Sequence, residues 1–225
     1  MKRITVLLAE DHMVVREGFR KMLELEADLE VVGEAQDGRE AVTRVKQLRP
    51  AVVLMDIAMP RLNGLEATRQ VLKAVPTTKV IMLSAHSDDA YIEDATKSGA
   101  KGFLIKQTSS HVVCEAIREV QKGNTFFSPT VAKRLHQLEG KSPDRIGPPP
   151  SRNVHLSSRE TEVLQLIAEG KANKQTAAEL GISTKTVEKH RDHVMQKLNI
   201  HDTAGLTRYA ISAGIVESSV QLTII

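Results

Sequence analysis

Short apolar runs alternate with amphipathic helical patterns along the first half of the chain. The runs have the length of buried strands and cover residues 4–9, 29–33, 51–55, 79–84 and 102–105. Apolar residues recur at helical spacing over residues 14–26, 38–48, 64–74, 88–98 and 110–122. This alternation predicts βαβ units, and hence an α/β fold with a doubly wound five-stranded parallel sheet and helices on both faces.

The pattern changes after this region. Pro129 can open one more helix through about Glu139, and the segment 140–153 that follows contains three consecutive prolines. Consecutive prolines favour polyproline II, so we expect a semi-rigid, exposed linker. We predict a first domain at residues 1–125, a linker helix with a proline-rich linker at 126–152, and a second domain at 153–218.

The predicted second domain begins with a helix. Ser157 or Ser158, together with Glu160 or Glu162, can form a capping box at its start, and Gly170 can end it.

Two helices joined by a tight turn follow. We expect a short helix over 174–180, a turn at Gly181, and a longer helix over 184–198 that Ser183 caps. This arrangement is a helix-turn-helix. One more helix, over 203–213, completes a small all-α domain.

Polar residues close four of the apolar runs in the first domain. Asp56 ends one run, Glu10 and Asp11 follow another, and Ser84 and Lys106 close two more. The carboxyl ends of parallel strands meet at one edge of a doubly wound sheet, so these side chains should share a crevice. Three carboxylates, a hydroxyl and an ammonium can hold a hard divalent cation and a phosphoryl group.

The charges of these groups suggest a role for each. An aspartate accepts a phosphoryl group only where the incoming charge is neutralised. We predict that Glu10, Asp11 and Asp56 hold Mg2+, that Lys106 pairs with one phosphoryl oxygen, and that Ser84 donates to another. The alternative is that the acids merely solvate loops and the lysine is a surface charge. Joint placement at successive strand ends argues against it.

Composition narrows the range of partners. Aromatic content is 3% and Trp is absent, so a base-stacking surface is unexpected. The net charge of +3 suggests a polyanionic partner. Residues 1–130 carry 18 basic and 18 acidic side chains and residues 131–225 carry 13 and 10, so the excess lies in the second part. Because it is small, DNA affinity would have to come from local arrangement and dimerisation.

Cysteine content and hydropathy bear on the compartment. Cys114 is the only cysteine, which excludes an internal disulfide and favours a reducing cytoplasm. We expect it to be a small buried hydrophobe. The first apolar run stops after a few residues in two acids, so we interpret it as a strand and not a signal peptide. No stretch approaches the length of a membrane span, and we expect no membrane partner.

The helix over 184–198 has one packed face and one polar face. Val187, Val194 and Leu198 form the apolar stripe, with His190 near its edge. The outward face carries Lys185, Lys189, Asp192 and Gln196, flanked by Glu188 and His193. Such side chains are placed to enter a major groove, where lysines donate to guanine and acids accept from cytosine. The alternative is a solvated helix with i,i+4 pairs, but those pairs would be like-charged and mildly destabilising.

Contacts to DNA phosphates set the register of a protein and carry no sequence information. The candidates are Asn173, Lys174, Thr184, Thr186 and Arg191.

The first domain resembles the receiver domain of bacterial two-component response regulators. The resemblance covers the chain to about residue 120 and rests on Glu10-Asp11, Asp56, Met59-Pro60, Gly64, Ser84-Ala85 and Lys106 within GFLIK. It implies a flavodoxin-like fold and transfer of a phosphoryl group from a sensor histidine kinase to Asp56. In this family an aromatic residue three positions before the lysine turns inward when the hydroxyl residue engages phosphate, and Phe103 holds that position. Family members more often have two aspartates where this chain has Glu10-Asp11.

The second domain resembles the LuxR-type helix-turn-helix of the NarL/FixJ branch of response regulators. The resemblance covers nearly all of residues 155–213 and rests on Leu156 to Glu160, Glu162 to Leu164, Gly170, Asn173-Lys174, Ala177, Leu180, Ile182-Ser183, Thr186-Val187, His190 and Lys197-Leu198. It implies a homodimer when phosphorylated and paired half-sites on DNA. One departure is Gln175-Thr176, where Glu-Ile is usual, and it predicts looser packing of the short helix.

We therefore predict a phosphorylation-controlled transcription regulator that binds double-stranded promoter DNA as a dimer through helix 184–198. Catalysis should be limited to self-phosphorylation and self-dephosphorylation. A phosphatase acting through an aspartyl-phosphate is one alternative, but it would need an acid two residues beyond Asp56, where the chain has Ala58. Another alternative is a regulator whose first domain responds to a protein or small ligand and never to phosphate.

Overall fold

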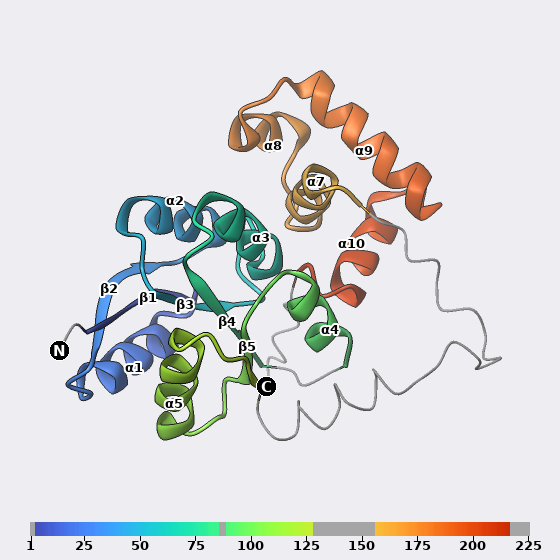
Figure 1. Ribbon diagram of the computed structural model, residues 1–225. Helices are drawn as coiled ribbons and strands as arrows, with labels where there is room; N and C mark the ends of the chain where they lie inside the picture. Colours follow the sequence, from blue (N-terminus) through green and yellow to red (C-terminus); the bar gives the residue numbers. More distant parts are fainter. Residues whose placement is uncertain (1–2, 86–88, 128–155, 217–225) are drawn as a thin grey trace, which may run out of the picture. The chain divides into compact units, whose positions relative to one another are not determined.

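The computed structural model describes residues 3–85, 89–127 and 156–216 (Figure 1). The chain divides into two compact units, Met1–Pro148 and Pro149–Ile225. None of the helices within the described ranges is long and apolar enough to cross a membrane. The helix expected over 129–139 and most of the expected linker lie outside the described residues.

The first unit is built on one parallel sheet with the strand order β2-β1-β3-β4-β5-β6. Its strands are β1 (Ile4–Ala9), β2 (Leu29–Ala35), β3 (Val52–Asp56), β4 (Lys79–Ser84), β5 (Gly102–Ile105) and β6 (Phe126–Phe127). The chain runs from β1 outward to β2 and then returns past β1 to β3. This order confirms the predicted doubly wound topology.

Within the described residues, the sheet has one strand more than the five that the sequence predicted. β6 has two residues and pairs with β5, with Phe126 beside Gly102 and Phe127 beside Phe103. So short a run has no periodic pattern, and it becomes a strand only through pairing with a distant segment. β6 also carries the sheet past residue 125, where the sequence suggested that the first domain ends.

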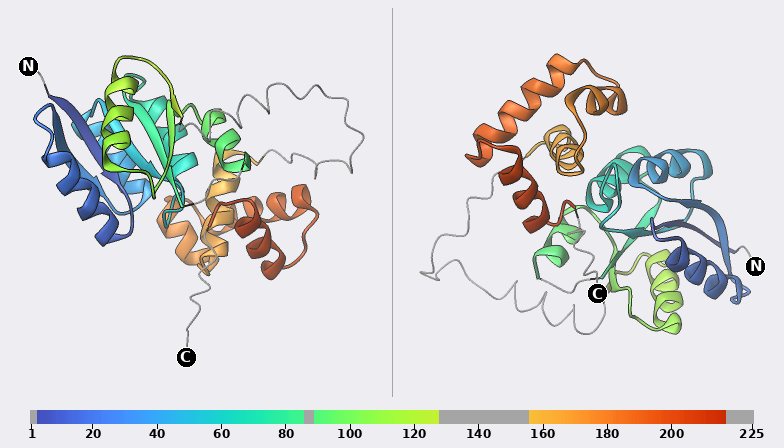
Figure 2. Two further views of the ribbon diagram at one scale, coloured as in Figure 1. Left: turned by 90° about the horizontal axis from the view of Figure 1, so that it is seen from below. Right: turned by 180° about the vertical axis from the view of Figure 1, so that it is seen from behind.

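Helices cover both faces of this sheet (Figures 1 and 2). They are α1 (Met13–Glu24), α2 (Gly38–Leu48), α3 (Gly64–Ala74), α4 (Asp89–Lys97) and α5 (Ser110–Gln121). α1 and α5 pack on one face, and α2, α3 and α4 pack on the other. Each face of the sheet therefore has its own apolar core.

The strands supply side chains to both cores. In β1, Val6 and Leu8 enter the core beneath α1 and α5, whereas Leu7 and Ala9 enter the opposite core. Successive strand residues point to opposite faces, so a strand covered on both sides consists of a continuous apolar run. Cys114 is buried in the α1/α5 core, as expected of a small hydrophobe.

The described part of the second unit is helical. Its helices are α7 (Ser158–Ala168), α8 (Asn173–Leu180), α9 (Thr184–Leu198) and α10 (Thr203–Ser212). The capping box of α7 uses Ser157 and Glu160, the first residue of each predicted pair. Gly181 has a φ of +63° and ends α8, which makes the tight turn into α9 possible. Val187, Val194 and other apolar side chains form a third core.

Candidate functional site

Adjacent strand ends bring the predicted polar residues to one edge of the sheet. Parallel pairing of β1 with β3 sets Glu10, just past β1, beside Asp56 at the end of β3. Ser84 ends β4, which neighbours β3. Lys106 follows β5, and its backbone N–H donates to the Ser84 carbonyl oxygen at 2.8 Å. Strand register alone thus gathers residues that lie far apart in the sequence.

The Lys106 ammonium joins two of the acids. Its Nζ lies 3.0 Å from Asp56 Oδ2 and 2.9 Å from Glu10 Oε2. It also donates a hydrogen bond to Glu10 Oε1 at 3.1 Å. The side chains of Asp56 and Glu10 are each 2% exposed and that of Lys106 is 16% exposed. Exclusion of water strengthens such charge contacts.

Burial and neighbouring charges shift the pKa values of Asp56 and Lys106. Burial raises the pKa of Asp56 to about 7, Glu10 adds to the rise, and Lys106 opposes it. Burial alone would lower the pKa of Lys106, but the Asp56 and Glu10 carboxylates outweigh it and leave that pKa raised. At neutral pH the site is therefore poised to take up further positive charge.

The arrangement of oxygens fits a divalent cation. Glu10, Asp11, His12 and Asp56 each place a potential ligand atom within 4.8 Å of the others. Glu10 Oε2, Asp11 Oδ1 and Asp56 Oδ2 are buried. The charged atoms beside them are Lys106 Nζ for Glu10 and Asp56, and His12 Nδ1 at 2.9 Å for Asp11. Mg2+ binds through carboxylate oxygens of this kind.

His12 lies at the edge of the acidic group formed by Glu10, Asp11 and Asp56. It is the N-cap residue of α1 and its side chain is 58% exposed. The Asp11 carboxylate raises the pKa of His12, and Glu10 adds to the effect through a hydrogen bond.

The turn between β3 and α3 requires a glycine. Gly64 N–H donates to the Ile57 carbonyl oxygen at 2.8 Å, and a Cβ at Gly64 would lie 1.9 Å from the Asp56 carbonyl oxygen. Asn63 caps α3 by accepting from the Glu66 N–H at 2.9 Å. The close backbone approach fixes the chain immediately after Asp56.

Ser84 and Phe103 are both buried, on the neighbouring strands β4 and β5. Ser84 is 3% exposed at the end of β4. Phe103 is fully buried in β5, in the core beneath α2, α3 and α4. Their roles in signalling stay predictions.

Sequence reasoning missed Arg16, which contacts the same site. Its side chain is 8% exposed, and Nη1 donates to the Glu10 carbonyl oxygen at 2.6 Å. The sequence does hold a signal, because Arg16 lies on the stripe of α1 that also carries Phe19 and Leu23 and faces the sheet. A charged residue on such a stripe needs a buried partner.

Six of the predicted DNA contacts line one open depression on the outer face of α9. These are Lys185, Thr186, Glu188, Lys189, Asp192 and His193, and Ser183 and Gln196 complete the lining. Val187 and Val194 are fully buried on the opposite face. The division into packed and polar faces is confirmed, and contact with DNA stays a prediction.

The other predicted DNA contacts lie elsewhere. Lys174 in α8 and Thr184 at the start of α9 are exposed. Arg191 Nη2 donates to Thr203 Oγ1 at 2.6 Å, so this guanidinium contacts α10.

An ion pair that sequence reasoning missed joins α7 to α9. Lys197 Nζ lies 2.6 Å from Glu160 Oε2, and His193 Nδ1 lies 4.0 Å from Glu160 Oε1. Glu160 is buried and is also part of the capping box of α7, so one carboxylate links the start of α7 to α9.

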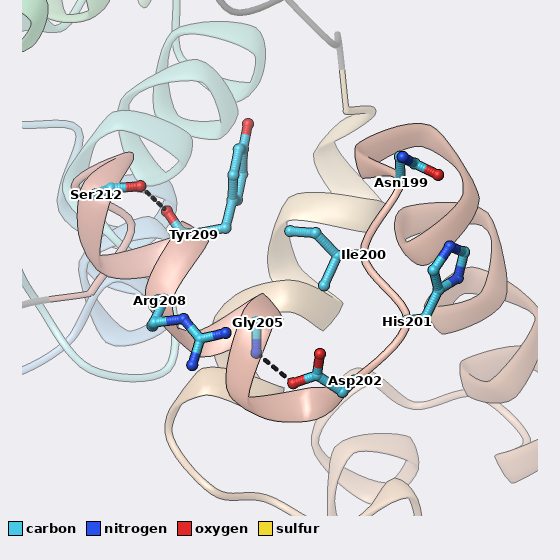
Figure 3. Close-up of a pocket in the computed structure, with 8 residues that line it drawn as sticks. All are labelled: Asn199, Ile200, His201, Asp202, Gly205, Arg208, Tyr209 and Ser212. Atoms are coloured by element: carbon cyan, nitrogen blue, oxygen red, sulfur yellow. Dashed lines mark hydrogen bonds between the residues drawn. The ribbon is translucent and has the colours of Figure 1, made fainter.

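A second depression lies along α10 and the turn before it (Figure 3). Its lining residues are Asn199, Ile200, His201, Asp202, Gly205, Arg208, Tyr209 and Ser212. Asp202 accepts from the Gly205 N–H at 2.7 Å, which caps α10, and Ser212 Oγ donates to the Tyr209 carbonyl oxygen at 2.9 Å. These two bonds are local to α10.

Comparison with known proteins identifies the family of each unit. Residues 6–118 match the response regulator receiver domain, and residues 154–210 match the bacterial regulatory proteins of the luxR family. Transcriptional regulatory protein DegU of Brevibacillus brevis is 35% identical, over 96% of each chain. Oxygen regulatory protein NreC of Staphylococcus carnosus is 36% identical, over 94% of this chain and 99% of the relative. A solved structure of RcsB from Salmonella typhimurium is 26% identical with a TM-score of 0.57, over 94% of this chain and 100% of that one.

The chain belongs to the two-component response regulators that join a receiver domain to a LuxR-type helix-turn-helix domain. It is a phosphorylation-controlled, DNA-binding transcription regulator and not a conventional enzyme. Another solved structure similar to this chain, with a TM-score of 0.58, is a complex of RcsB with DNA.

Proposed function

We propose that Asp56 accepts a phosphoryl group from a sensor histidine kinase and that this event controls binding of double-stranded promoter DNA through α9. The observation that carries the proposal is the buried Asp56 carboxylate, which shares one strand edge with Glu10 and has Lys106 Nζ at 3.0 Å.

The chemistry follows from the charges at this edge. An Asp56 oxygen attacks phosphorus while the bond from phosphorus to the donor nitrogen breaks. Lys106 pairs with one phosphoryl oxygen and the Ser84 hydroxyl donates to another. Glu10, Asp11 and Asp56 would hold Mg2+, which when bound supplies positive charge against the incoming phosphoryl group. Hydrolysis of the resulting acyl phosphate on the same chain would reset the state.

The response to phosphate would pass from Ser84 to Phe103 on the neighbouring strand. On the DNA side, Lys185, Glu188, Lys189, Asp192 and His193 would meet base edges, whereas Lys174, Thr184, Thr186 and Arg191 would meet phosphates. A homodimer of the phosphorylated chain would present two copies of α9 to paired half-sites. A cytoplasmic location is part of the proposal, because the kinase and the DNA must both be reached.

Labelling by a small phosphodonor tests the first step. Acetyl phosphate with Mg2+ should add one phosphoryl group, measured by intact-protein mass spectrometry, and Asp56→Asn should add none. Glu30→Gln removes an exposed carboxylate from β2 and should label like the natural protein. Equal labelling of Asp56→Asn would show that another residue is the acceptor. No labelling of the natural protein would favour a receiver that responds to a different ligand.

A DNA titration tests the second step. Fluorescence anisotropy on a sequence selected in vitro should give tighter binding after treatment with acetyl phosphate and Mg2+, and Asp56→Asn should show no change. Equal affinity in both states would remove the switch while leaving DNA binding intact.

A further inference from the structure

We propose that Arg16 is a positioning residue for the acidic site, which fixes the backbone of Glu10 and Asp11 so that their carboxylates are oriented for a divalent cation. This inference deepens the proposed function and rests on it.

The Arg16 guanidinium reaches back from α1 to the end of β1. Nη1 donates to the Glu10 carbonyl oxygen at 2.6 Å and lies 3.5 Å from the Asp11 carbonyl oxygen. These carbonyls belong to the residues whose side chains form the acidic group. The guanidinium therefore acts on their backbone and does not itself occupy their carboxylate oxygens.

β2 anchors this contact from the other side. Arg16 Nε donates to Glu34 Oε2 at 3.0 Å, and Glu34 lies in β2. The Glu10 N–H donates to the carbonyl oxygen of Ala35, the next residue of β2, at 3.0 Å. The N–H and the carbonyl of Glu10 are thus both tied to β2, the first directly and the second through Arg16. With its backbone held at both groups, Glu10 keeps its carboxylate beside Asp56 before any cation arrives.

A second arginine on α1 provides the contrast. Arg20 Nη1 also pairs with Glu34, at 2.7 Å to Oε1, and its Nε pairs with Glu24 at 2.9 Å. Arg20 is 51% exposed, and in the part of the chain that the structure describes its side chain pairs with Glu24 and Glu34 and not with Glu10, Asp11 or Asp56. Arg16 and Arg20 therefore share helix, charge and anchor, and they differ in the bonds to the Glu10 and Asp11 carbonyls.

The shape of the guanidinium matters as well as its charge. A planar fork can bond a carbonyl oxygen and a carboxylate at once, whereas the single ammonium of lysine cannot span both in the same geometry. Arg16→Lys would keep the positive charge near the acids and lose this bridge. It separates positioning from simple charge compensation.

Cation binding by the full-length chain tests the inference. Electron paramagnetic resonance measures free Mn2+ directly, and competition then gives the affinity for Mg2+. Arg16→Met should weaken both affinities about tenfold, the loss typical of residues that orient metal ligands. Arg16→Lys should lose most of the same affinity, and Arg20→Met should stay within about twofold of the natural protein. Natural affinity in a folded Arg16→Met overturns the inference, and natural affinity in Arg16→Lys assigns Arg16 to charge compensation.

Phosphorylation by acetyl phosphate gives a second readout. The Mg2+ concentration for half-maximal rate should rise about tenfold in Arg16→Met, while the rate at saturating Mg2+ stays near the natural value. If Arg16 only stabilised the fold, then well below the unfolding temperature Arg16→Met would change neither the Mg2+ concentration for half-maximal rate nor the rate at saturating Mg2+.

Glu34→Gln decides the matter if Arg16→Met does not fold. It leaves the Arg16 guanidinium in place and weakens its anchor, so an intermediate loss of Mn2+ affinity is expected and unchanged affinity overturns the inference. If the natural chain binds neither cation, the proposed function is contradicted at this site. If the natural chain binds and all variants bind equally, only the role of Arg16 fails.

Discussion

Asp56 is a buried carboxylate in a site with more negative than positive charge. Glu10 and Asp56 share one ammonium, that of Lys106, and Asp11 stands beside them. Burial and the nearby carboxylates oppose ionisation of Asp56, so without a cation the folded chain carries an electrostatic penalty there. The arrangement that the proposed phosphoryl and cation chemistry requires thus lowers the stability of the cation-free fold.

Removing this carboxylate should stabilise the cation-free protein in a pH-dependent way. The pKa of Asp56 is raised from 3.8 to about 7 in the folded chain. Between these values the folded chain keeps a proton that the unfolded chain releases, so the stability of the natural protein falls as pH rises to about 7. The side chain of Asp56→Asn does not titrate. The free energy of unfolding of this variant should therefore exceed that of the natural protein by nearly zero at pH 4 and by at most about 4 kcal/mol above pH 7. Urea unfolding followed by circular dichroism, with EDTA present, measures it.

Asp28 supplies a control of opposite sign. Hydrogen bonds from Arg118 lower the pKa of Asp28, so its contribution to stability is present above its unfolded pKa and is lost as pH falls. Asp28→Asn should therefore destabilise at neutral pH and converge with the natural protein in acid. If the difference in free energy of unfolding between Asp56→Asn and the natural protein stayed constant from pH 4 to 8, the proposed electrostatics of Asp56 would be contradicted.

Thr176 carries an unmet polar group in the second unit. Its side chain is fully buried in α8, and Oγ1 has no hydrogen-bond partner in the part of the chain that the structure describes. Burying a hydroxyl without a partner opposes folding.

Thr176→Val should raise the free energy of unfolding of the second unit by about 1 kcal/mol, because valine keeps the shape and removes the unpaired hydroxyl. Thr78→Val is the matched control. Thr78 is 1% exposed and donates to the Pro50 carbonyl oxygen at 2.8 Å, so the same change should destabilise the first unit. Calorimetry of both variants gives the sign of each change in the free energy of unfolding. If Thr176→Val is destabilised, the Thr176 hydroxyl has a hydrogen-bond partner in the natural protein.

Among the elements, the β3–α3 turn has the tightest geometry near the site. The strand must end on Asp56, and the helix must start close enough for Gly64 to bond the Ile57 carbonyl oxygen. α3 therefore packs against the strand backbone itself. A side chain at the first position of α3 would have to displace that backbone.

Gly64→Ala should lower the free energy of unfolding by about 3 kcal/mol, because the new Cβ would overlap the Asp56 carbonyl oxygen. The rate of labelling by acetyl phosphate should fall with it, since Asp56 must shift. Gly18→Ala is the control, because Gly18 lies exposed in α1 with no atom within 4 Å of the added Cβ. That change should stabilise by about 1 kcal/mol through helix propensity. Equal effects of the two substitutions would contradict the requirement for glycine at Gly64.

For the whole molecule, the distribution of charge predicts how it meets DNA. Residues 1–130 are balanced at 18 basic and 18 acidic side chains, and residues 131–225 carry 13 and 10. So small an excess gives little non-specific attraction. We therefore predict that affinity depends on a few lysines placed on α8 and α9 and on the pairing of two copies.

Two lysines should separate phosphate contact from base reading. Lys174→Gln should weaken binding to specific and non-specific DNA alike and reduce the salt slope of log K by about one. Lys189→Gln, on the outer face of α9, should weaken specific DNA by about 1–3 kcal/mol and affect non-specific DNA less. Titrations at several salt concentrations measure both quantities. Loss of specificity in Lys174→Gln would exchange the two assignments.

The sequence allowed most elements to be predicted because their signals are local. Strands buried on both faces appear as continuous apolar runs, and helix ends carry caps such as Ser157 and Ser183. The acidic edge could be predicted as well, because residues that follow parallel strands must meet at one edge whatever the details of packing.

What the sequence by itself determined was therefore the order of elements, the doubly wound sheet, the helix-turn-helix, and the gathering of Glu10, Asp56 and Lys106. Only the tertiary structure decided that Phe126–Phe127 pairs with β5, that Arg16 bonds the Glu10 backbone, and that Glu160 ties α7 to Lys197 in α9. The physical reason is range. Patterns of burial and capping are written in neighbouring residues, whereas a hydrogen bond between distant segments exists only after the chain has packed and brought donor and acceptor together.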